Sequence, residues 1–203
     1  MTAPELERSL VYHCRVFDVY EGDVRLPDDR IARQSWIDHR PCIAVVPVNP
    51  AGNLVLINQY RHATGGMIVE IPAGNMDREG ETVEQCVQRE LAEETGFQAG
   101  RLVKLFEGYL VPGYCNEYMH FFLALDLRPA TLPADEDEYI QTMTVPFSEA
   151  LRMIKEKEII DVKTALGIQL ARAYREEAAR EGVRSPSLSA ADAPVSPVPP
   201  PGP

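Results

Sequence analysis

One amphipathic helix limits what this chain can fold into. Residues 80–97 read GETVEQCVQRELAEETGF, and at about 100° per residue Val83, Val87 and Leu91 fall on one flank of a helix. Glu90 and Glu94 lie beside the start of the same flank. Charge normally lies opposite the buried stripe, because an unpaired buried carboxylate is costly. Either a cation meets these two glutamates, or the segment is not the helix that its pattern indicates.

The spacing of the glutamates suits a hard metal ion. Glu90, Glu93 and Glu94 stand at i, i+3 and i+4, so their side chains can converge beside the helix. Carboxylate oxygens are the ligands that Mg²⁺ and Ca²⁺ prefer, and bound Mg²⁺ commonly also contacts substrate phosphates. The alternative is an acidic face open to solvent, with Arg89 as its counterion. Glu81 is explained equally well by its place near the helix start, where free N–H groups favour an anion.

Composition narrows the class of partner. The chain has 203 residues, of which 45% are hydrophobic and 25% charged, as in ordinary globular domains. Its formal net charge of −11 argues against nucleic acid as a partner, because binding DNA or RNA needs clustered Lys and Arg. No run of residues approaches the roughly 18 apolar residues of a membrane span, so no membrane partner is expected. An acidic protein that processes phosphates would need metal ions.

The cysteines and the N-terminus indicate a cytoplasmic protein. Cys14, Cys42, Cys86 and Cys115 are far apart and form no C-x-x-C pair, so their spacing suggests neither a zinc site nor a redox motif. Reduced thiols are therefore expected rather than a disulfide framework. The opening residues MTAPELERS lack the basic start and apolar run of a signal peptide.

Short strands and helices along the chain predict a mixed α/β or α+β domain. Residues 10–40 hold short β-rich pieces that could form a small N-terminal sheet, and 42–48 and 54–60 flank a turn at 49–53 that predicts a hairpin. Further strands are expected near 67–71, 101–110, 118–127 and 139–145, before helices near 147–157 and 161–181. We expect an N-terminal β-rich segment (1–40), a catalytic domain (41–181) and a disordered tail rich in Pro, Ser and Ala (182–203).

The segment from Gly74 to Phe97 resembles the Nudix box, G-x5-E-x7-R-E-U-x-E-E-x-G-U, where U is a bulky aliphatic residue. The matching positions, with correct mutual spacing, are Glu81, Arg89, Glu90, Leu91, Glu93, Glu94 and Gly96. Two departures are visible: Phe97 is aromatic, and six residues rather than five separate Gly74 from Glu81. The extra residue lengthens the loop before the helix, and we expect a bulge to absorb the added distance between the helix and Ala73 and Gly74. The resemblance implies the Nudix fold, a mixed β-sheet sandwiched between helices with a small N-terminal antiparallel sheet.

Sequence outside the box is similar to one subgroup, the ADP-ribose and ADP-sugar pyrophosphatases. Residues 70–74, EIPAG, look like the E-x-P-A-G entry of those enzymes, and Pro112 in VPGYCNE lies about where they have a marker proline. Residues 135–140, DEDEYI, resemble their acidic loop. Alone, such a run is commonly a solvated turn; beside a metal-binding helix it becomes a candidate source of the catalytic base.

Carried over by position, the resemblance implies a set of roles. Glu90 and Glu94 would bind Mg²⁺, for which Mn²⁺ is a possible substitute, with Glu93 assisting and the Ala73 carbonyl completing the shell. Arg89 would orient the glutamates through ion pairs.

The acidic loop would supply the remaining chemistry. Glu136 matches the base that activates water, and Glu138 matches a further metal ligand. The two positions are close enough for these roles to be exchanged.

Substrate contacts are implied in the same way. Arg61 matches a position that contacts the ligand, although a surface arginine at a strand end is an equal alternative. Glu117 lies in the loop expected to close over the distal sugar, with Pro112 and Gly113 in the same loop and Glu70 in the E-x-P-A-G segment. Trp36, the only tryptophan, could stack on adenine or could pack in a core or interface.

The resemblance favours Mg²⁺-dependent hydrolysis of a nucleoside diphosphate sugar, with ADP-ribose giving AMP and ribose 5-phosphate. In the subgroup, N-terminal strands exchange across a homodimer, so a homodimer is implied here. Alternative substrates are GDP-mannose, a dinucleoside polyphosphate or NADH. A second alternative is a non-catalytic sensor of an ADP-ribose-type ligand; the intact box carboxylates and acidic balance argue against it.

Overall fold

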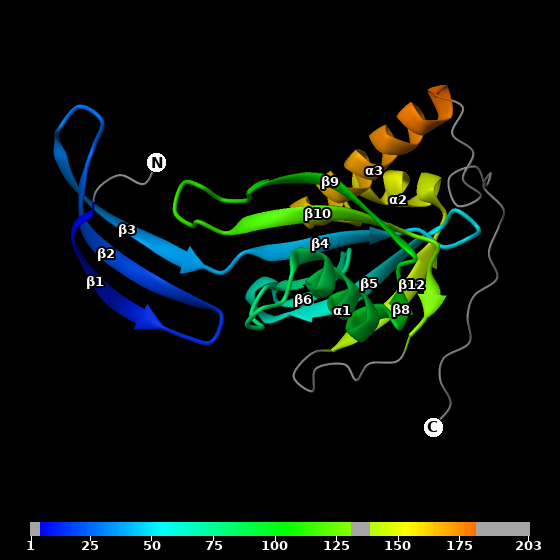
Figure 1. Cartoon of the computed structure of the whole chain (residues 1–203), viewed down its shortest axis with the longest axis horizontal. Coiled ribbons are helices and arrows are strands. Elements are labelled where there is room, and N and C mark those ends of the chain that lie inside the picture. Colours follow the sequence, from blue (N-terminus) through cyan, green and yellow to red (C-terminus); the bar gives the residue numbers. More distant parts are fainter. Residues whose placement is uncertain (1–4, 131–138, 182–203) are drawn as a thin grey trace.

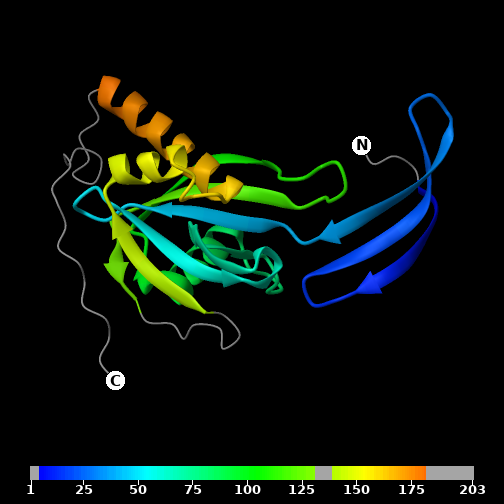
Figure 2. The same cartoon turned by 180° about the vertical axis from the view of Figure 1, so that it is seen from behind.

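The computed structural model describes residues 5–130 and 139–181. Their strands and helices form a layered body, with a separate small sheet at one end (Figure 1, and from behind in Figure 2). The C-terminal tail expected at 182–203 lies outside the described residues, so its disorder stays a prediction.

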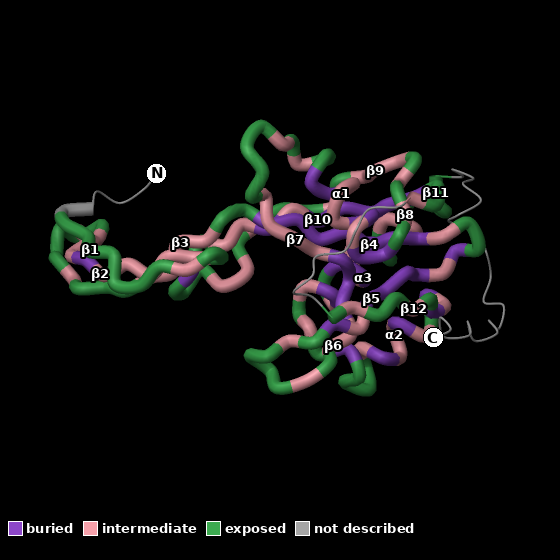
Figure 3. The backbone as a smooth tube through the Cα atoms, turned by 90° about the horizontal axis from the view of Figure 1, so that it is seen from below, coloured by how far each residue is buried: buried purple, intermediate pink, exposed green. Residues whose placement is uncertain are grey.

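The separate sheet is the N-terminal part of the chain. It contains β1 (Glu5–His13), β2 (Phe17–Arg25) and β3 (Ile31–His39), which pair antiparallel in the order β1-β2-β3. Figure 3 shows its residues as mostly exposed or half-buried, whereas the central strands of the body, at residues 42–47, 54–61 and 118–125, are largely buried. The β-rich pieces expected between residues 10 and 40 are therefore one continuous meander.

Two sheets build the body. A mixed sheet has the order β7-β4-β10-β9, in which β4 (Cys42–Pro47) pairs parallel with β10 (Tyr118–Leu125) and antiparallel with β7 (Ala73–Asn75), and β10 pairs antiparallel with β9 (Arg101–Tyr109). An antiparallel sheet has the order β12-β5-β6, formed by β5 (Leu54–Arg61), β6 (Gly66–Glu70) and β12 (Ile140–Val145). The short strands β8 (Phe97–Gln98) and β11 (Arg128–Pro129) pair with each other.

Helices cover both faces of the mixed sheet. These are α1 (Val83–Thr95), α2 (Phe147–Lys155) and α3 (Val162–Arg180), with a short 3-10 turn, η1 (His62–Thr64), between β5 and β6. Alternation along β4 separates two cores: Cys42, Ala44 and Val46 pack with residues of α2 and α3, whereas Ile43 and Val45 pack with residues of α1. The sheet thus lies between helices, as the family resemblance implies.

The hairpin expected from residues 42–60 is wrong in its pairing. A turn does form, since the Asn49 N–H donates to the Asn53 carbonyl at 2.9 Å, and Val48 and Leu54 make an isolated antiparallel bridge. Beyond that bridge the strands separate, and β4 joins the mixed sheet while β5 joins the antiparallel one. Both are mostly buried strands that can pair elsewhere, and the turn sequence does not encode which partner each strand takes.

The helix predicted within residues 80–97 is present, with well-formed ends. At the start of α1 the Thr82 hydroxyl accepts from the Gln85 N–H and the Gln85 side chain accepts from the Thr82 N–H, a reciprocal cap. The helix ends at Gly96, whose φ of 73° is a left-handed conformation that glycine adopts without strain. Val87 and Leu91 are fully buried, which fixes the side of α1 that faces the sheet.

Two further observations concern expectations from composition. Among the described residues, none of the helices has the length and apolar character needed to cross a membrane. All four cysteines fall in the described part of the chain and none is in a disulfide.

Candidate active site

The carboxylates of α1 gather around one arginine. Arg89 donates two hydrogen bonds to Glu81, at 2.8 and 2.9 Å, and its Nη1 donates to Glu90 at 2.6 Å and to Glu93 at 3.1 Å. Its side chain is only 10% exposed. One guanidinium fork thus holds three carboxylates in a fixed arrangement, which is the orienting role that the box implies for Arg89.

The fourth carboxylate, on Glu94, is directed at β7 instead. Glu94 is buried, and its Oε2 accepts a hydrogen bond from the Ala73 N–H at 3.0 Å. Next to it, Gly74 leaves room for Glu90, because a Cβ at Gly74 would come within 2.0 Å of the Glu90 carboxyl group. The E-x-P-A-G segment and the box helix therefore meet at this point, although they are joined through a long loop.

Charge in this cluster suits a divalent cation. Four carboxyl groups, those of Glu81, Glu90, Glu93 and Glu94, lie beside two cations, Arg89 and Arg78, the latter donating to Glu93 at 3.0 Å. The hydrogen bond from Arg89 lowers the pKa of Glu81, and the same pairing raises the pKa of Arg89, so these charges persist at neutral pH. Clustered oxygen donors with excess negative charge are the chemistry that a hard ion such as Mg²⁺ binds.

The extra residue before Glu81 is accommodated in a turn of the loop, and Ala73 and Gly74 keep a regular pairing with β4. Register between β4 and β7 runs without a shift. The Glu81 N–H instead donates to the Arg78 carbonyl at 3.2 Å, and Gly80 has a φ of 77°. A surface turn accommodates an added residue without disturbing the hydrogen bonds between β4 and β7. A bulge in β7 would interrupt those hydrogen bonds.

A cavity of about 420 Å³ opens beside the α1 glutamates. Its lining contains both basic and acidic side chains. The basic residues are Arg15, Arg40, Arg61, Arg78, Arg89 and Lys163, and the acidic residues are Glu70, Asp77, Glu90, Glu117 and Asp161. Of the sequence-predicted site residues, the cavity brings together Arg61, Glu70, Ala73, Arg89, Glu90 and Glu117. Such a charged, concave lining fits a small polyanion together with metal ions.

Glu70 anchors two of the cavity's cations. It is 2% exposed and accepts two hydrogen bonds from Arg61, at 2.8 and 2.9 Å, as well as an ion pair from Lys163. Lys163 lies in the first turn of α3 and also pairs with Asp161, the cap of that helix. Sequence reasoning missed Lys163 and Asp161, because no local pattern indicates a contact that spans 93 residues.

The loop that contains Pro112 and Gly113 joins the N-terminal sheet to the body. The Ile37 N–H donates to the Tyr114 carbonyl at 2.7 Å, and the Asn116 N–H donates back to the Ile37 carbonyl at 3.2 Å. Pro112 and Gly113 are exposed and lie outside the cavity lining, whereas Glu117, at the end of the loop, reaches it.

Trp36 is placed away from the cavity lining of its own chain. It is half-buried on β3 and stacks on Tyr20 of β2, with ring centroids 5.9 Å apart. Arg8 in turn lies over the Tyr20 ring at 4.5 Å. Glu136 and Glu138, the expected base and additional ligand, lie outside the described residues.

Replacing Glu70 by Gln is expected to reduce the free energy of unfolding by about 1–3 kcal/mol at pH 7, since buried hydrogen bonds to charged partners are lost. Burial raises the pKa of Glu70, but Arg61 and Lys163 outweigh it and the net pKa lies below its ordinary value of 4.5. A lowered folded pKa gives stability that is complete above 4.5 and disappears as pH falls through the folded pKa.

The difference between wild type and Glu70→Gln should therefore shrink on acidification below about pH 4.5, as measured by urea unfolding at a series of pH values. Glu84→Gln, an exposed change on α1, is the matched control and should show no such trend. A wild-type-to-variant difference that is constant across this pH range would contradict the ion-pair account.

Comparison with known proteins identifies the family. The model of the NUDIX domain matches residues 38–164, more than half of the chain. The chain belongs to the NUDIX family and is a Nudix hydrolase, as the segment from Gly74 to Phe97 predicted. Hydrolases of this family depend on divalent metal ions.

Individual relatives narrow the comparison. The chain is 35% identical over 166 residues to an ADP-ribose pyrophosphatase of Bacillus subtilis, covering 81% of this chain and 89% of that one. It is 39% identical over 134 residues to a GDP-mannose pyrophosphatase of Yersinia enterocolitica, covering 62% and 69%. A solved structure described as an ADP compounds hydrolase superposes with a TM-score of 0.74 at 24% identity, over 91% of this chain and 98% of that one, and this supports the fold.

Proposed function

We propose that this Nudix hydrolase cleaves the diphosphate of a nucleoside diphosphate sugar, and that ADP-ribose is its main substrate. Water attacks one phosphorus of the P–O–P link, the bridging bond breaks, and AMP and ribose 5-phosphate are released with the protons of the attacking water. The ADP-ribose pyrophosphatase of Bacillus subtilis, similar over most of both chains, supports this choice of substrate.

The arrangement of charge around the cavity carries the proposal. Glu90, at the α1 edge, supplies carboxylate oxygen to the cavity, while Arg61 and Lys163 present positive charge from the other side, both held by Glu70. A diphosphate needs cations around its oxygens, and an acidic protein can offer them through such placed side chains and through bound metal. Neither feature is explained by a solvated acidic face.

The metal would be held by Glu90 and Glu94, with Glu93 and the Ala73 carbonyl completing the set. When bound, Mg²⁺ or Mn²⁺ would neutralise charge on the diphosphate and make the attacking water more acidic. The chain's own groups do the positioning: Arg89 fixes Glu90 and Glu93, and the Ala73 N–H fixes one oxygen of Glu94, so its other oxygen has a defined direction.

A general base completes the reaction. We assign proton removal from the attacking water to Glu136, with Glu138 as a further metal ligand. Both assignments rest on the likeness of residues 135–140 to the acidic loop of the ADP-sugar enzymes.

Substrate recognition is assigned to residues that line the cavity and to the loop that ends at Glu117. Arg61 would contact the phosphates and Glu117 the distal sugar, and both line the cavity. Glu70 would act by holding Arg61 in place. Pro112 and Gly113 would shape the loop that ends at Glu117. Trp36 lies outside the lining of the cavity in its own chain, so it would contact only adenine that is bound in the cavity of a partner subunit.

Hydrolysis of a substrate panel tests the proposal. ADP-ribose, GDP-mannose, a dinucleoside polyphosphate and NADH would each be incubated with the full chain and Mg²⁺ or Mn²⁺, and the products identified by mass. AMP and ribose 5-phosphate from ADP-ribose, with the highest kcat/KM of the panel, is the expected result. Preferential release of GMP would favour the GDP-mannose alternative, which the Yersinia relative supports. Tight binding of ADP-ribose without any metal-dependent hydrolysis would favour the sensor alternative.

The N-terminal sheet supports a homodimer. Leu10, Val11, Tyr12 and Ile31 on β1 and β3 are each more than half exposed, on a sheet that stands apart from the body (Figure 2). Large apolar side chains exposed on such a sheet favour an interface. Sedimentation equilibrium should give twice the mass of one chain, and a monomer at micromolar concentration would contradict this assignment.

A further inference from the structure

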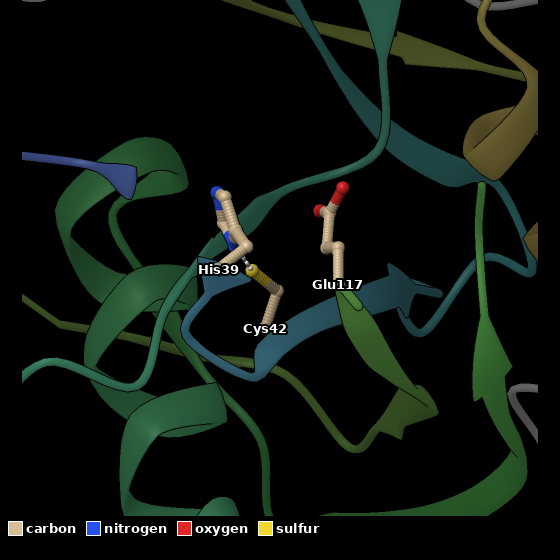
Figure 4. A group of neighbouring side chains, drawn as sticks. All are labelled: His39, Cys42 and Glu117. Atoms are coloured by element: carbon tan, nitrogen blue, oxygen red, sulfur yellow. Dashed lines mark hydrogen bonds between the residues drawn. The ribbon is translucent and has the colours of Figure 1, made fainter. Parts of the chain in front are cut away.

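Three side chains at one rim of the cavity can converge on a single ion. His39, Cys42 and Glu117 each offer a ligand atom, and these atoms all lie within 4.8 Å of one another (Figure 4). We propose that they form a binding site for a thiophilic divalent cation, represented by Zn²⁺, separate from the glutamates of α1.

Backbone pairing brings the three residues together. His39 ends β3 and Cys42 begins β4, with only Arg40 and Pro41 between them. The partner of Cys42 on the parallel strand β10 is Met119, two residues after Glu117. In addition, the His39 N–H donates to the Asn116 side chain at 2.7 Å, which ties the end of β3 to the loop before β10. The cluster is therefore built on strand ends rather than on freely moving side chains.

The distances suit zinc. A Zn–N distance of about 2.05 Å and a Zn–S distance of about 2.3 Å, at a tetrahedral angle, place the nitrogen and sulfur about 3.6 Å apart. The His39 Nδ1 and the Cys42 Sγ are 3.6 Å apart. The Glu117 carboxylate lies within 4.8 Å of both atoms and is half-buried at the cavity, so it would have to move toward them to coordinate the same ion.

Ion binding must replace hydrogen bonds that both His39 and the Cys42 thiol now make, the latter to the Arg40 carbonyl and the Asn75 side chain. Nδ1 of His39 is 2.7 Å from the Arg40 carbonyl, so in the metal-free form it donates there. Moving that proton to the other ring nitrogen, which points away from the thiol in Figure 4, frees Nδ1 as a ligand. The imidazole keeps its proton in this shift, so only the Cys42 thiol proton is released when the metal binds, which is the usual behaviour of a thiol ligand.

Ligand chemistry separates this site from the α1 cluster. Imidazole and thiolate favour Zn²⁺ and similar ions over Mg²⁺, which prefers oxygen ligands. Cys42 is 4% exposed, and burial together with the negative charge of Glu117 raises the pKa of its thiol. A bound cation would stabilise the Cys42 thiolate and so lower the pKa of this thiol again. The Asn75 Oδ1, 3.1 Å from the Cys42 Sγ, or a water would supply the fourth position.

Cobalt and zinc titrations of the full chain test the proposal. With Mg²⁺ saturating, Co²⁺ should produce a thiolate-to-cobalt charge-transfer band, and calorimetry with Zn²⁺ should show one ion per chain. Cys42→Ser, which is nearly isosteric, should abolish the band and weaken Zn²⁺ at least about tenfold, on the scale of changes at the edge of a metal site. Glu117→Gln should weaken Zn²⁺ while keeping the band.

Two controls identify the ligands. Cys115→Ser changes another buried thiol and should leave both signals intact. Glu94→Gln removes a proposed Mg²⁺ ligand and should also leave them intact, which separates this site from the proposed hydrolysis. Circular dichroism checks that each variant folds. Absence of the band in wild type, its persistence in Cys42→Ser, or its loss in Cys115→Ser would overturn the proposal, whatever the substrate panel shows.

Discussion

Replacing Glu94 by Gln is expected to lower turnover at saturating Mg²⁺ by at least about a hundredfold, the scale of a lost electrostatic stabiliser. The reason is the chemistry of the changed group: an amide carries no negative charge and is a poor ligand for Mg²⁺ in place of a carboxylate. Its oxygen can still accept the hydrogen bond that Glu94 receives from the Ala73 N–H. Fold and stability should therefore be nearly unchanged.

The measurement compares kcat on ADP-ribose with the melting temperature of the same preparation. Glu84→Gln makes the same chemical change at an exposed position of α1 and should keep wild-type turnover. Near wild-type turnover of Glu94→Gln at saturating Mg²⁺ would remove Glu94 from the set of metal ligands. A large loss of stability would instead show that the carboxylate acts through packing.

Local sequence patterns predicted features of this fold that depend on local interactions. The buried flank at Val87 and Leu91 was expected because helical geometry alone defines it. The misplaced charges of Glu90 and Glu94 were equally visible, because helical geometry fixes which residues share a face. The cap at Thr82 and the left-handed end at Gly96 were not predicted, although their causes lie in the same stretch of sequence.

Pairing between distant strands could not be predicted in the same way. The turn at 49–53 forms, yet β4 and β5 enter different sheets, and each takes a partner from a distant part of the chain that the turn sequence does not encode. The sequence showed that the loop before Glu81 is one residue longer than the motif, but it did not show where in the loop that residue is accommodated. The structure places it in the turn that contains Gly80.

Contacts across the cavity were the hardest part of the site to predict. In the sequence, Lys163 is one charged residue among others near the start of a helix. Its contact with Glu70 arises because α3 packs beside β6. The cysteine spacing likewise indicated no zinc site, since His39, Cys42 and Glu117 come from separate strands and a loop. A ligand set that is assembled by sheet register leaves no spacing signature in the sequence.

Replacing Arg89 by Met is expected to destabilise the fold by about 3–5 kcal/mol, the cost of removing one partner from a buried ionic cluster. Arg89 is 10% exposed, and its partners Glu81, Glu90 and Glu93 are 11–14% exposed, so solvent screens their mutual repulsion poorly. The neutral side chain would leave these carboxylates without their shared guanidinium. Urea unfolding at pH 7, in buffer free of divalent ions so that no other cation compensates, gives the measurement.

Two further variants show whether charge or geometry matters in this cluster. Arg89→Lys keeps the charge but lacks the planar fork that reaches Glu81 through two hydrogen bonds, so it should recover only part of the loss. Arg172→Met, at an exposed arginine of α3, should change the unfolding free energy by no more than about 0.5 kcal/mol. If Arg89→Met were as stable as Arg172→Met, the carboxylates would not depend on Arg89 for their arrangement. The expected contrast with Glu94→Gln, which should lose turnover but not stability, would assign structural and catalytic work to different residues of one helix.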